Sequence, residues 1–377
     1  MNPRRFSLAS LVHRAHAPTD ASRRMLLRAI AGTGLAAGAG LVPEVAGALP
    51  TRALAFPRDH GAHPDLRTEW WYVTGHATAG SRRFGFQVTF FRSRVDATRG
   101  LASAFAARHL VFAHAAVTDL QGQRLWHDQR IARAGFGIAQ AAEGDTRLKL
   151  RDWSLERLAD GSYRARLPAT DFSLDFRFTP TQPLLLQGQQ GLSRKGPEPA
   201  QASYYYSQPQ LQAAGRIGLK GQTFEVAGRA WLDHEWSEAL LHPQAVGWDW
   251  IGMNLDDGSA LTAFRLRRAD GSTLWDGGSW RAPGQPVLAF ENGRTGFTPQ
   301  RLWSSPGSGA RYPVQWKVDT PAGRFTVRAL LDNQELDSRT STGAIYWEGL
   351  SELLDDAGRP RGQGYLEMTG YAQPLKL

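Results

Sequence analysis

The sequence predicts a nearly all-β protein built from two barrel-like units, and three observations support this prediction. Apolar residues alternate with polar ones along many short segments, which is the period of a half-buried strand. Asp-Gly and Asn-Gly pairs, which are typical of hairpin turns, separate several of these segments. Helical periodicity is scarce. About 15–18 strands are implied, which is too many for one barrel and suits two barrel or sandwich units.

Each predicted strand and turn follows from a short local pattern. Apolar residues alternate with Gly, Gln and Thr over residues 84–90, and the same period recurs over 111–117, before a turn at 119–122. Only residues 101–109 and 351–354 could each form a turn or two of helix. Hairpin turns are predicted at Asp160-Gly161, Asp257-Gly258, Asp270-Gly271 and Asn292-Gly293.

The length of 377 residues suits two domains of ordinary size. A boundary is expected either in the Gly-, Pro- and Gln-rich stretch 187–202 or just after Trp236, where Leu241-His242-Pro243 breaks the strand pattern. We place the N-terminal domain at residues 56–236 and the C-terminal domain at 237–377.

The N-terminus is predicted to be an export signal. Ser22-Arg23-Arg24-Met25-Leu26-Leu27-Arg28 precedes a Gly- and Ala-rich apolar stretch of about 14 residues, which is too short to span a bilayer. The pattern resembles a twin-arginine signal, with small-x-small cleavage sites at residues 46–48 and 53–55. We assign residues 1–48 to the signal, with cleavage as late as residue 55 as the alternative. The mature protein is then expected in the periplasm or secreted, without a transmembrane segment.

The net charge of +9 is concentrated at this N-terminus. Residues 1–48 carry six arginines and two acids, a net charge of +4, which leaves +5 on the remaining 329 residues. No basic run longer than Arg267-Arg268 occurs there, so a nucleic-acid partner is not expected. Because the chain has no cysteine, disulfides, thiolate metal sites and cysteine nucleophiles are excluded.

The densest group of candidate site residues is the segment 231–236, Trp-Leu-Asp-His-Glu-Trp, followed by Trp248 and Trp250. In an extended strand Asp233 and Glu235 share one face. A histidine beside an indole could donate protons with a pKa tuned by its pocket, and indole faces stabilise cations. In the structural alternative, the acids satisfy backbone groups at a turn and His234 is a hydrogen-bonded core histidine.

A second group is Glu69-Trp70-Trp71-Tyr72, which reads as a strand. Glu69 and Trp71 should share one face, and Trp70 and Tyr72 the other. A buried glutamate among aromatic rings needs a partner, because an unpaired buried carboxylate is costly.

The loop before this strand contains His60 and His63, which could bind a metal together with Asp59 or Asp65. An isolated H-x-x-H pattern in a Pro- and Gly-containing loop is weak evidence, and loop histidines are typically solvated. We therefore predict no metal site and no cofactor.

Further candidates lie in Tyr204-Tyr205-Tyr206 and near the C-terminus. Alternation places Tyr204 and Tyr206 on one side of a strand, where their hydroxyls could orient a ligand; plain strand packing is the alternative. Glu348 and Glu367 lie among aromatic residues, where each could simply pair with an arginine.

Motifs of common enzyme classes are absent from the sequence. It contains no Walker motif, no G-x-G-x-x-G after a strand, no H-E-x-x-H and no G-x-S-x-G elbow, so an α/β-hydrolase is excluded. All thirteen tryptophans follow residue 69, which indicates extensive apolar surfaces, either cores or a pocket for an apolar ligand.

Five segments together resemble the AttH-like family of "predicted secreted hydrolases". The resemblance implies two lipocalin-like β-barrel domains side by side. It also implies kinship with the carotenoid 1,2-hydratases and, more distantly, with lipocalin-like pericyclases. The segments are residues 56–61, 67–75, 202–207, 230–236 and 364–371.

In the hydratases, a histidine and a tryptophan two residues later are implicated in acid-catalysed addition of water to an isoprenoid double bond. Carried over, these are His234, as general acid or base, and Trp236, which would stabilise the cation. Asp233, the acid just before, would orient His234. The chain departs from the hydratases in its export signal and in Glu69, where a small residue is expected. It therefore lies closer to the AttH branch, which is often associated with ABC transporters.

Two functions follow from this resemblance. The first is a hydratase-like enzyme acting on a long apolar substrate. The second is a non-catalytic periplasmic carrier that exchanges an apolar molecule or lipid with an inner-membrane ABC transporter. A solvent-reachable His234 favours the enzyme, and a fully packed His234 bonded to backbone favours the carrier. The candidate ligand-binding residues are Glu69, Trp70, Trp71, Tyr72, Tyr204, Tyr206, Glu235, Trp248 and Trp250.

Overall fold

The computed structural model describes residues 47–239 and 241–375. The predicted signal at residues 1–48 lies outside this part except for its last two residues. Within it the chain forms 25 strands and the two three-residue 3-10 helices η1 (Arg58–His60) and η2 (Asp96–Thr98). Neither helix has the length that crossing a bilayer requires.

The first sheet has 13 strands in the order β4-β3-β2-β1-β13-β12-β9-β8-β7-β6-β5, with β10 and β11 also paired to β12. Its strands are β1 (Thr68–Ala79), β2 (Arg82–Arg94), β3 (His109–Asp119), β4 (Arg124–Arg133), β5 (Ala139–Ala141), β6 (Arg147–Leu150), β7 (Trp153–Arg157), β8 (Tyr163–Pro168), β9 (Phe172–Thr179), β10 (Leu185–Leu186), β11 (Leu192–Arg194), β12 (Ala202–Leu219) and β13 (Gln222–Ser237).

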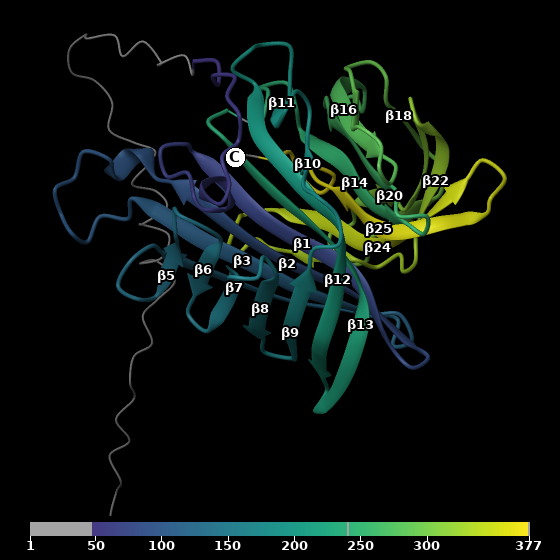
Figure 1. Cartoon of the computed structure of the whole chain (residues 1–377), viewed down its shortest axis with the longest axis horizontal. Coiled ribbons are helices and arrows are strands. Elements are labelled where there is room, and N and C mark those ends of the chain that lie inside the picture. Colours follow the sequence, from purple (N-terminus) through teal and green to yellow (C-terminus); the bar gives the residue numbers. More distant parts are fainter. Residues whose placement is uncertain (1–46, 240, 376–377) are drawn as a thin grey trace, which may run out of the picture. The chain divides into compact units, whose positions relative to one another are not determined.

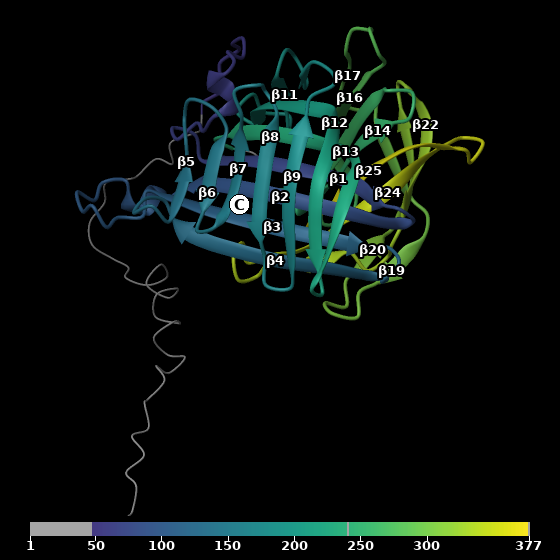
Figure 2. The same cartoon turned by 60° about the horizontal axis from the view of Figure 1, so that its bottom comes forward.

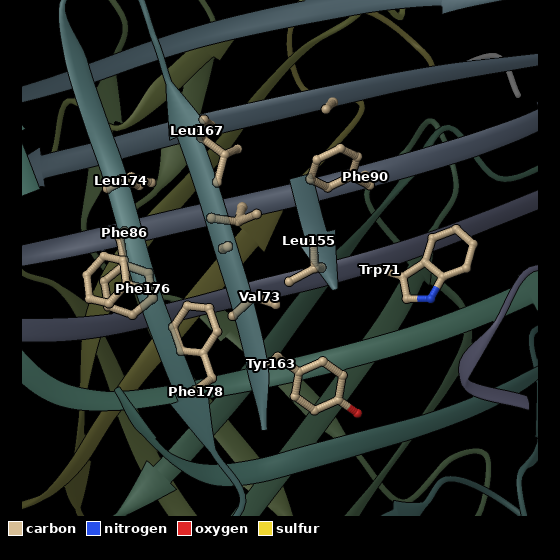
Figure 3. Close-up of a cluster of buried hydrophobic side chains, with 14 of the residues drawn as sticks. Trp71, Val73, Phe86, Phe90, Leu155, Tyr163, Leu167, Leu174, Phe176 and Phe178 are labelled. Carbon is tan, nitrogen blue, oxygen red and sulfur yellow. The ribbon is translucent and has the colours of Figure 1, made fainter. Parts of the chain in front are cut away.

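This sheet curls into a nearly closed barrel (Figures 1 and 2). Its edge strand β4 approaches strands near the opposite edge, where the Arg130 guanidinium lies 4.3 Å from the centroid of the Trp153 ring of β7. Inward side chains from opposite walls fill the barrel, and Figure 3 shows Phe86, Phe176 and Phe178 packed together. Phe86 and Phe176 have ring centroids 4.4 Å apart. The barrel interior is therefore a packed core along much of its length.

The second sheet has 10 strands, and a separate pair is formed by β19 and β20. The 10-stranded sheet forms a half-barrel around Trp316, Trp347 and Tyr312. Its strands, with this pair, are β14 (Gly247–Leu255), β15 (Ala260–Arg267), β16 (Thr273–Arg281), β17 (Leu288–Phe290), β18 (Gly296–Pro299), β19 (Leu302–Ser304), β20 (Arg311–Pro313), β21 (Gln315–Thr320), β22 (Gly323–Ala329), β23 (Glu335–Asp337), β24 (Ile345–Asp355) and β25 (Pro360–Met368).

The two sheets contact each other through the outer face of β1 and β2 and the facing side of β24 and β25. Gly85 shows how close this contact is: a Cβ there would lie 2.8 Å from the Tyr365 hydroxyl and 2.9 Å from the Leu350 Cβ. Buried hydrogen bonds also cross the contact, such as Thr118 Oγ1 donating to Gln334 Oε1 at 2.8 Å. The cavity described below lies in this contact.

The predicted all-β architecture with two barrel-like domains is confirmed, although the second is an open half-barrel. Turns at Asp160-Gly161, Asp257-Gly258 and Asp270-Gly271 each join paired strands, whereas Asn292-Gly293 joins β17 and β18, which pair with other strands. No helix forms at 101–109 or 351–354: the former is irregular, and the latter lies in β24, because strand pairing outweighs local propensity. The domain boundary stays a prediction; β13 ends at Ser237 and β14 begins at Gly247.

Candidate functional site

Alternation along β1, β12 and β13 divides the predicted site residues between two faces. Trp71 pairs with His234, and Tyr72 pairs with Asp233, across the β1–β13 ladder. One face points into the first barrel, and the other points toward the second sheet. The inward set is Glu69, Trp71, Tyr204, Tyr206, His234 and Trp236. The outward set is Trp70, Tyr72, Tyr205, Asp233 and Glu235.

Glu69 is the centre of a buried polar cluster at the inner face. Its Oε1 accepts hydrogen bonds from His63 Nδ1 at 2.7 Å and His234 Nε2 at 2.9 Å. Its Oε2 accepts from Arg92 Nε at 2.9 Å and from the His63 backbone N–H at 2.9 Å. Burial raises the pKa of Glu69, but the bonds from His234 and His63 outweigh burial and hold that pKa well below its usual range.

His63 connects this carboxylate to a second one. Its Nε2 donates to Asp59 Oδ1 at 2.9 Å, and Asp59 accepts two hydrogen bonds from Arg52, at 2.6 and 3.1 Å. Both ring nitrogens therefore face carboxylates. Burial lowers the pKa of His63, yet the bonds to Asp59 and Glu69 raise it above its ordinary value. We call Arg52, Asp59, His63, Glu69, Arg92 and His234 the inner network.

His234 is fully enclosed by this network and by aromatic rings. Its exposed fraction is 0%, and it stacks on Trp71 at 4.5 Å between ring centroids. Tyr206 places its hydroxyl 3.3 Å from His234 Nδ1. Burial lowers the pKa of His234 to about 4, against the opposing effect of Glu69. The imidazole is therefore neutral at physiological pH, and the carboxylate that holds it is Glu69, on the partner strand.

The group His63, Glu69 and His234 could hold a metal, because one ligand atom from each lies within 4.8 Å of the others. The charges favour a hydrogen-bonded cluster instead. Arg92 and Arg52 already neutralise Glu69 and Asp59, and a divalent cation would compete with Arg92 for Glu69. The prediction that the loop histidines are solvated is wrong: His60 and His63 are buried, because the loop folds over the barrel.

A cavity of about 330 Å³ lies between the two sheets, in the size range of small-molecule sites. It borders Glu69 as well as the outward set. Most of its lining is apolar, so it suits an apolar ligand. Aromatic and aliphatic residues of the lining are Trp70, Tyr72, Phe91, Leu110, Phe112, Ile131, Tyr205, Leu241, Trp248, Trp250, Phe264, Leu266, Tyr346 and Leu375.

Besides Glu69, four carboxyls interrupt this apolar lining: Asp233, Glu235, Glu348 and Glu367. Glu235 is neutralised by Lys195, whose Nζ lies 3.0 Å from Oε1. Burial raises the pKa of Asp233 to about 7, although Ser207, Tyr205 and Trp231 all donate hydrogen bonds to it.

Glu348 and Glu367 face each other across the β24–β25 ladder. Burial raises the pKa of Glu367 to about 7, and burial together with the charge of Glu367 raises the pKa of Glu348 well above its usual range. Neither forms an ion pair in the described part of the chain; Glu348 accepts instead from Gln87 Nε2 at 2.7 Å. The arginine partners considered from the sequence are therefore wrong.

Two buried polar atoms of the cavity lining, Glu348 Oε1 and the Tyr72 hydroxyl, make no hydrogen bond of normal geometry to a described residue, although the two groups lie close enough for Glu348 to help raise the pKa of Tyr72. Buried polar groups are nearly always satisfied, so such a pair calls for an explanation. A polar group on a bound ligand would supply one.

The structure thus separates the sequence-predicted residues. Trp70, Tyr72, Asp233, Glu235, Trp248 and Trp250 line the cavity, and Glu69 borders it. Trp71, Tyr204, Tyr206, His234 and Trp236 lie in the barrel core. Sequence reasoning missed the role of Glu348 and Glu367, although the position of each acid among aromatic residues was a signal. Nothing local signalled Phe91, Phe112 or His114, which reach the cavity only through the tertiary fold.

We expect these buried carboxyls to shape the pH dependence of stability. A carboxyl with a raised native pKa stabilises the fold below its unfolded pKa of about 4, and this stabilisation is lost as pH rises through the native pKa, here about 7. Glu367→Gln should therefore flatten the decline in unfolding free energy between these pH values and be more stable than wild type at pH 8. Urea denaturation across pH measures this, and identical slopes would contradict it.

Fold and cavity define a two-barrel β protein with an apolar site between its sheets. The chain belongs to the AttH-like family, which matches residues 47–371, as the sequence predicted. A crystal structure of an AttH protein from Nitrosomonas europaea is 48% identical, with a TM-score of 0.81, over 87% of this chain and 100% of that one. No curated protein matches the sequence.

Two more distant structures share the fold. Kievitone hydratase from Nectria haematococca is 13% identical, with a TM-score of 0.66, over 85% of this chain and 94% of its own. CghA in complex with Sch210972 is 12% identical, with a TM-score of 0.51, over 82% of this chain and 89% of its own. At these identities the similarity concerns the fold alone.

Proposed function

We propose that the protein binds an elongated apolar molecule, of isoprenoid or lipid type, between its two sheets and adds water to a carbon–carbon double bond by acid catalysis. The observation that carries this proposal is a set of buried carboxyls with raised pKa in an otherwise apolar cavity. An acid whose pKa lies near the working pH is well suited to proton transfer.

The reaction follows from the lining residues. A protonated Asp233 or Glu367 gives its proton to one alkene carbon, and the π electrons of the double bond form the new C–H bond. The adjacent carbon becomes a cation, which the faces of Trp70, Trp248 and Trp250 stabilise. Water adds to the cation, and the carboxylate takes the extra proton. One water is added, the acid is regenerated, and no cofactor is consumed.

Carotenoid-type hydration with His234 as the acid, Trp236 as cation stabiliser and Asp233 as orienting group is the competing hypothesis from the family resemblance. The surroundings of His234 support it less well, because the imidazole is enclosed and its pKa is lowered to about 4. Kievitone hydratase is by name a water-adding enzyme, which agrees with hydration but assigns no residue here.

A second candidate function is a non-catalytic carrier for an apolar molecule, working with an inner-membrane ABC transporter after twin-arginine export to the periplasm. The full enclosure of His234 favours this candidate; the imidazole is bonded to the Glu69 side chain and also interacts with the Asp59 backbone. In this case the unpartnered Glu348 and Tyr72 atoms would hold a polar end of the cargo.

One experiment tests both functions. The protein is purified from the periplasm of its own host, its bound molecule is extracted, and the protein is then incubated with that molecule. We expect an isoprenoid or lipid-like molecule that gains the mass of one water. A bound molecule that never changes would indicate the carrier, and an empty protein would overturn both functions.

A further inference from the structure

Four large apolar side chains lie exposed together at one end of the first barrel. Phe105 is 74% exposed and Phe136 is 59% exposed, and their stacked rings lie 5.8 Å apart between centroids. Leu101 and Ile138 flank them. We call these four residues the apolar tip. Figures 1 and 2 show the loop between β2 and β3, which carries Leu101 and Phe105, projecting beyond the strand ends.

Positive charge surrounds the apolar tip. Arg99 and Arg108 are exposed on the projecting loop. The Arg133 guanidinium lies 4.1 Å above the Phe136 ring, which positions the ring and the charge together. The only acid of the loop between β2 and β3 is Asp96, which pairs with Arg94 of β2. Residues 129–141 contain Arg133 and Arg130, the latter paired with Asp152, and no acid. Exposed apolar side chains flanked by arginines match the boundary between acyl chains and anionic headgroups of a bilayer.

The strands next to the apolar tip carry residues of the cavity lining. Leu110, the second residue of β3, lines the cavity, as does Phe112. Ile131, which pairs with Phe112 across the β3–β4 ladder, lines the cavity and is 37% exposed. The tip therefore lies on the same pair of strands as one side of the cavity.

We propose that the apolar tip docks the protein on a membrane surface rich in anionic phospholipid. Phe105 and Phe136 enter the acyl boundary, and Arg99 and Arg108 contact lipid phosphates. A protein partner would need a surface of about 800 Å² per side, whereas four side chains on a projecting loop and a turn suit shallow insertion into lipid. Loading of the cavity from the docked state rests on the proposed function; docking itself does not.

The absence of cysteine allows a direct test. Phe105→Cys, and Leu302→Cys on the second domain as a control, are labelled with an environment-sensitive fluorophore. Both are mixed with vesicles of phosphatidylglycerol and phosphatidylcholine in equal parts, or of phosphatidylcholine alone. We expect a blue shift for the label at residue 105 with the anionic vesicles and none for the label at residue 302. All variants keep the same N-terminus, so any contribution of residues 1–46 is common to them.

Vesicle co-sedimentation then measures affinity. Phe105→Ser with Phe136→Ser should bind anionic vesicles at least about tenfold more weakly, because two buried rings are lost. Arg99→Gln with Arg108→Gln should weaken that binding about tenfold and leave weak binding to phosphatidylcholine unchanged. Leu288→Ser with Leu302→Ser removes two other exposed apolar side chains, 45% and 48% exposed, and should bind like wild type. Equal vesicle binding by the phenylalanine variant, or none by wild type, would overturn docking. An empty cavity would overturn only the proposed function.

Discussion

Replacing Glu69 by glutamine is expected to lower the free energy of unfolding by about 3–5 kcal/mol, the usual result of breaking a buried ion pair from one side. The change leaves the Arg92 guanidinium, which lies 2.9 Å from Glu69, buried without its counter-charge. It also removes one of the two carboxylates that raise the pKa of His63. Urea denaturation at neutral pH measures the loss.

Two comparisons make this prediction specific. Glu143→Gln removes an exposed carboxylate that lies 3.9 Å from Arg58, and it should change stability by no more than about 0.5 kcal/mol. Glu69→Gln combined with Arg92→Met should recover part of the loss, because neither charge is then left unpaired. A loss below about 1 kcal/mol for Glu69→Gln would mean that the inner network does not hold the barrel together.

Local patterns were sufficient to predict the all-β class, several strands and most turns, although the predicted 15–18 strands fall short of the 25 that the described residues form. Alternation over residues 84–90 and 111–117 corresponds to β2 and β3, because side chains on opposite faces of a strand meet different surroundings. These local patterns could not predict whether a sheet closes into a barrel. Whether a sheet curls into a barrel or stays open depends on pairing between distant strands, such as β1 with β13, whose partners are about 160 residues apart.

In the candidate site, too, local patterns predicted some features and the tertiary fold determined the others. Alternation correctly placed Asp233 and Glu235 on one face of β13 and His234 on the other, but it could not say which face meets the cavity. The hydrogen-bond partner of His234 could not be predicted either, because Glu69 is brought to His234 only by the pairing of β1 with β13. A motif that is compact in sequence is thus split between a core and a cavity.

The same reasoning explains why Glu348 and Glu367 were undervalued. An acid in an aromatic strand is usually explained by a nearby cation, and the sequence gives no means to exclude one. In the fold both carboxyls meet apolar rings and each other, which raises their pKa. Their ability to donate a proton near neutral pH therefore depends on burial between the two sheets, which the sequence alone does not reveal.

Replacing whichever acid donates the proton, either Glu367 by glutamine or Asp233 by asparagine, is expected to lower the turnover number about 10²- to 10⁴-fold while ligand binding persists, and the double variant should lose turnover in either case. Each change keeps the size of the side chain and removes the only proton that the group can transfer. Wild-type turnover should fall as pH rises through about 7, since only the protonated carboxyl can start the reaction. The assay follows water addition to the molecule recovered from the purified protein.

The matched control and the competing hypothesis belong in the same assay. Glu352→Gln removes a β24 carboxylate that pairs with Arg328 and does not line the cavity, so turnover should be unchanged. His234→Gln is scored per folded molecule, because it also disturbs the inner network. If it abolishes turnover while Glu367→Gln and Asp233→Asn both retain it, the histidine is the acid and the carboxyl mechanism is wrong. If a carboxyl variant loses turnover and wild-type turnover falls as pH rises through about 7, the proton comes from a cavity carboxyl, Asp233 or Glu367.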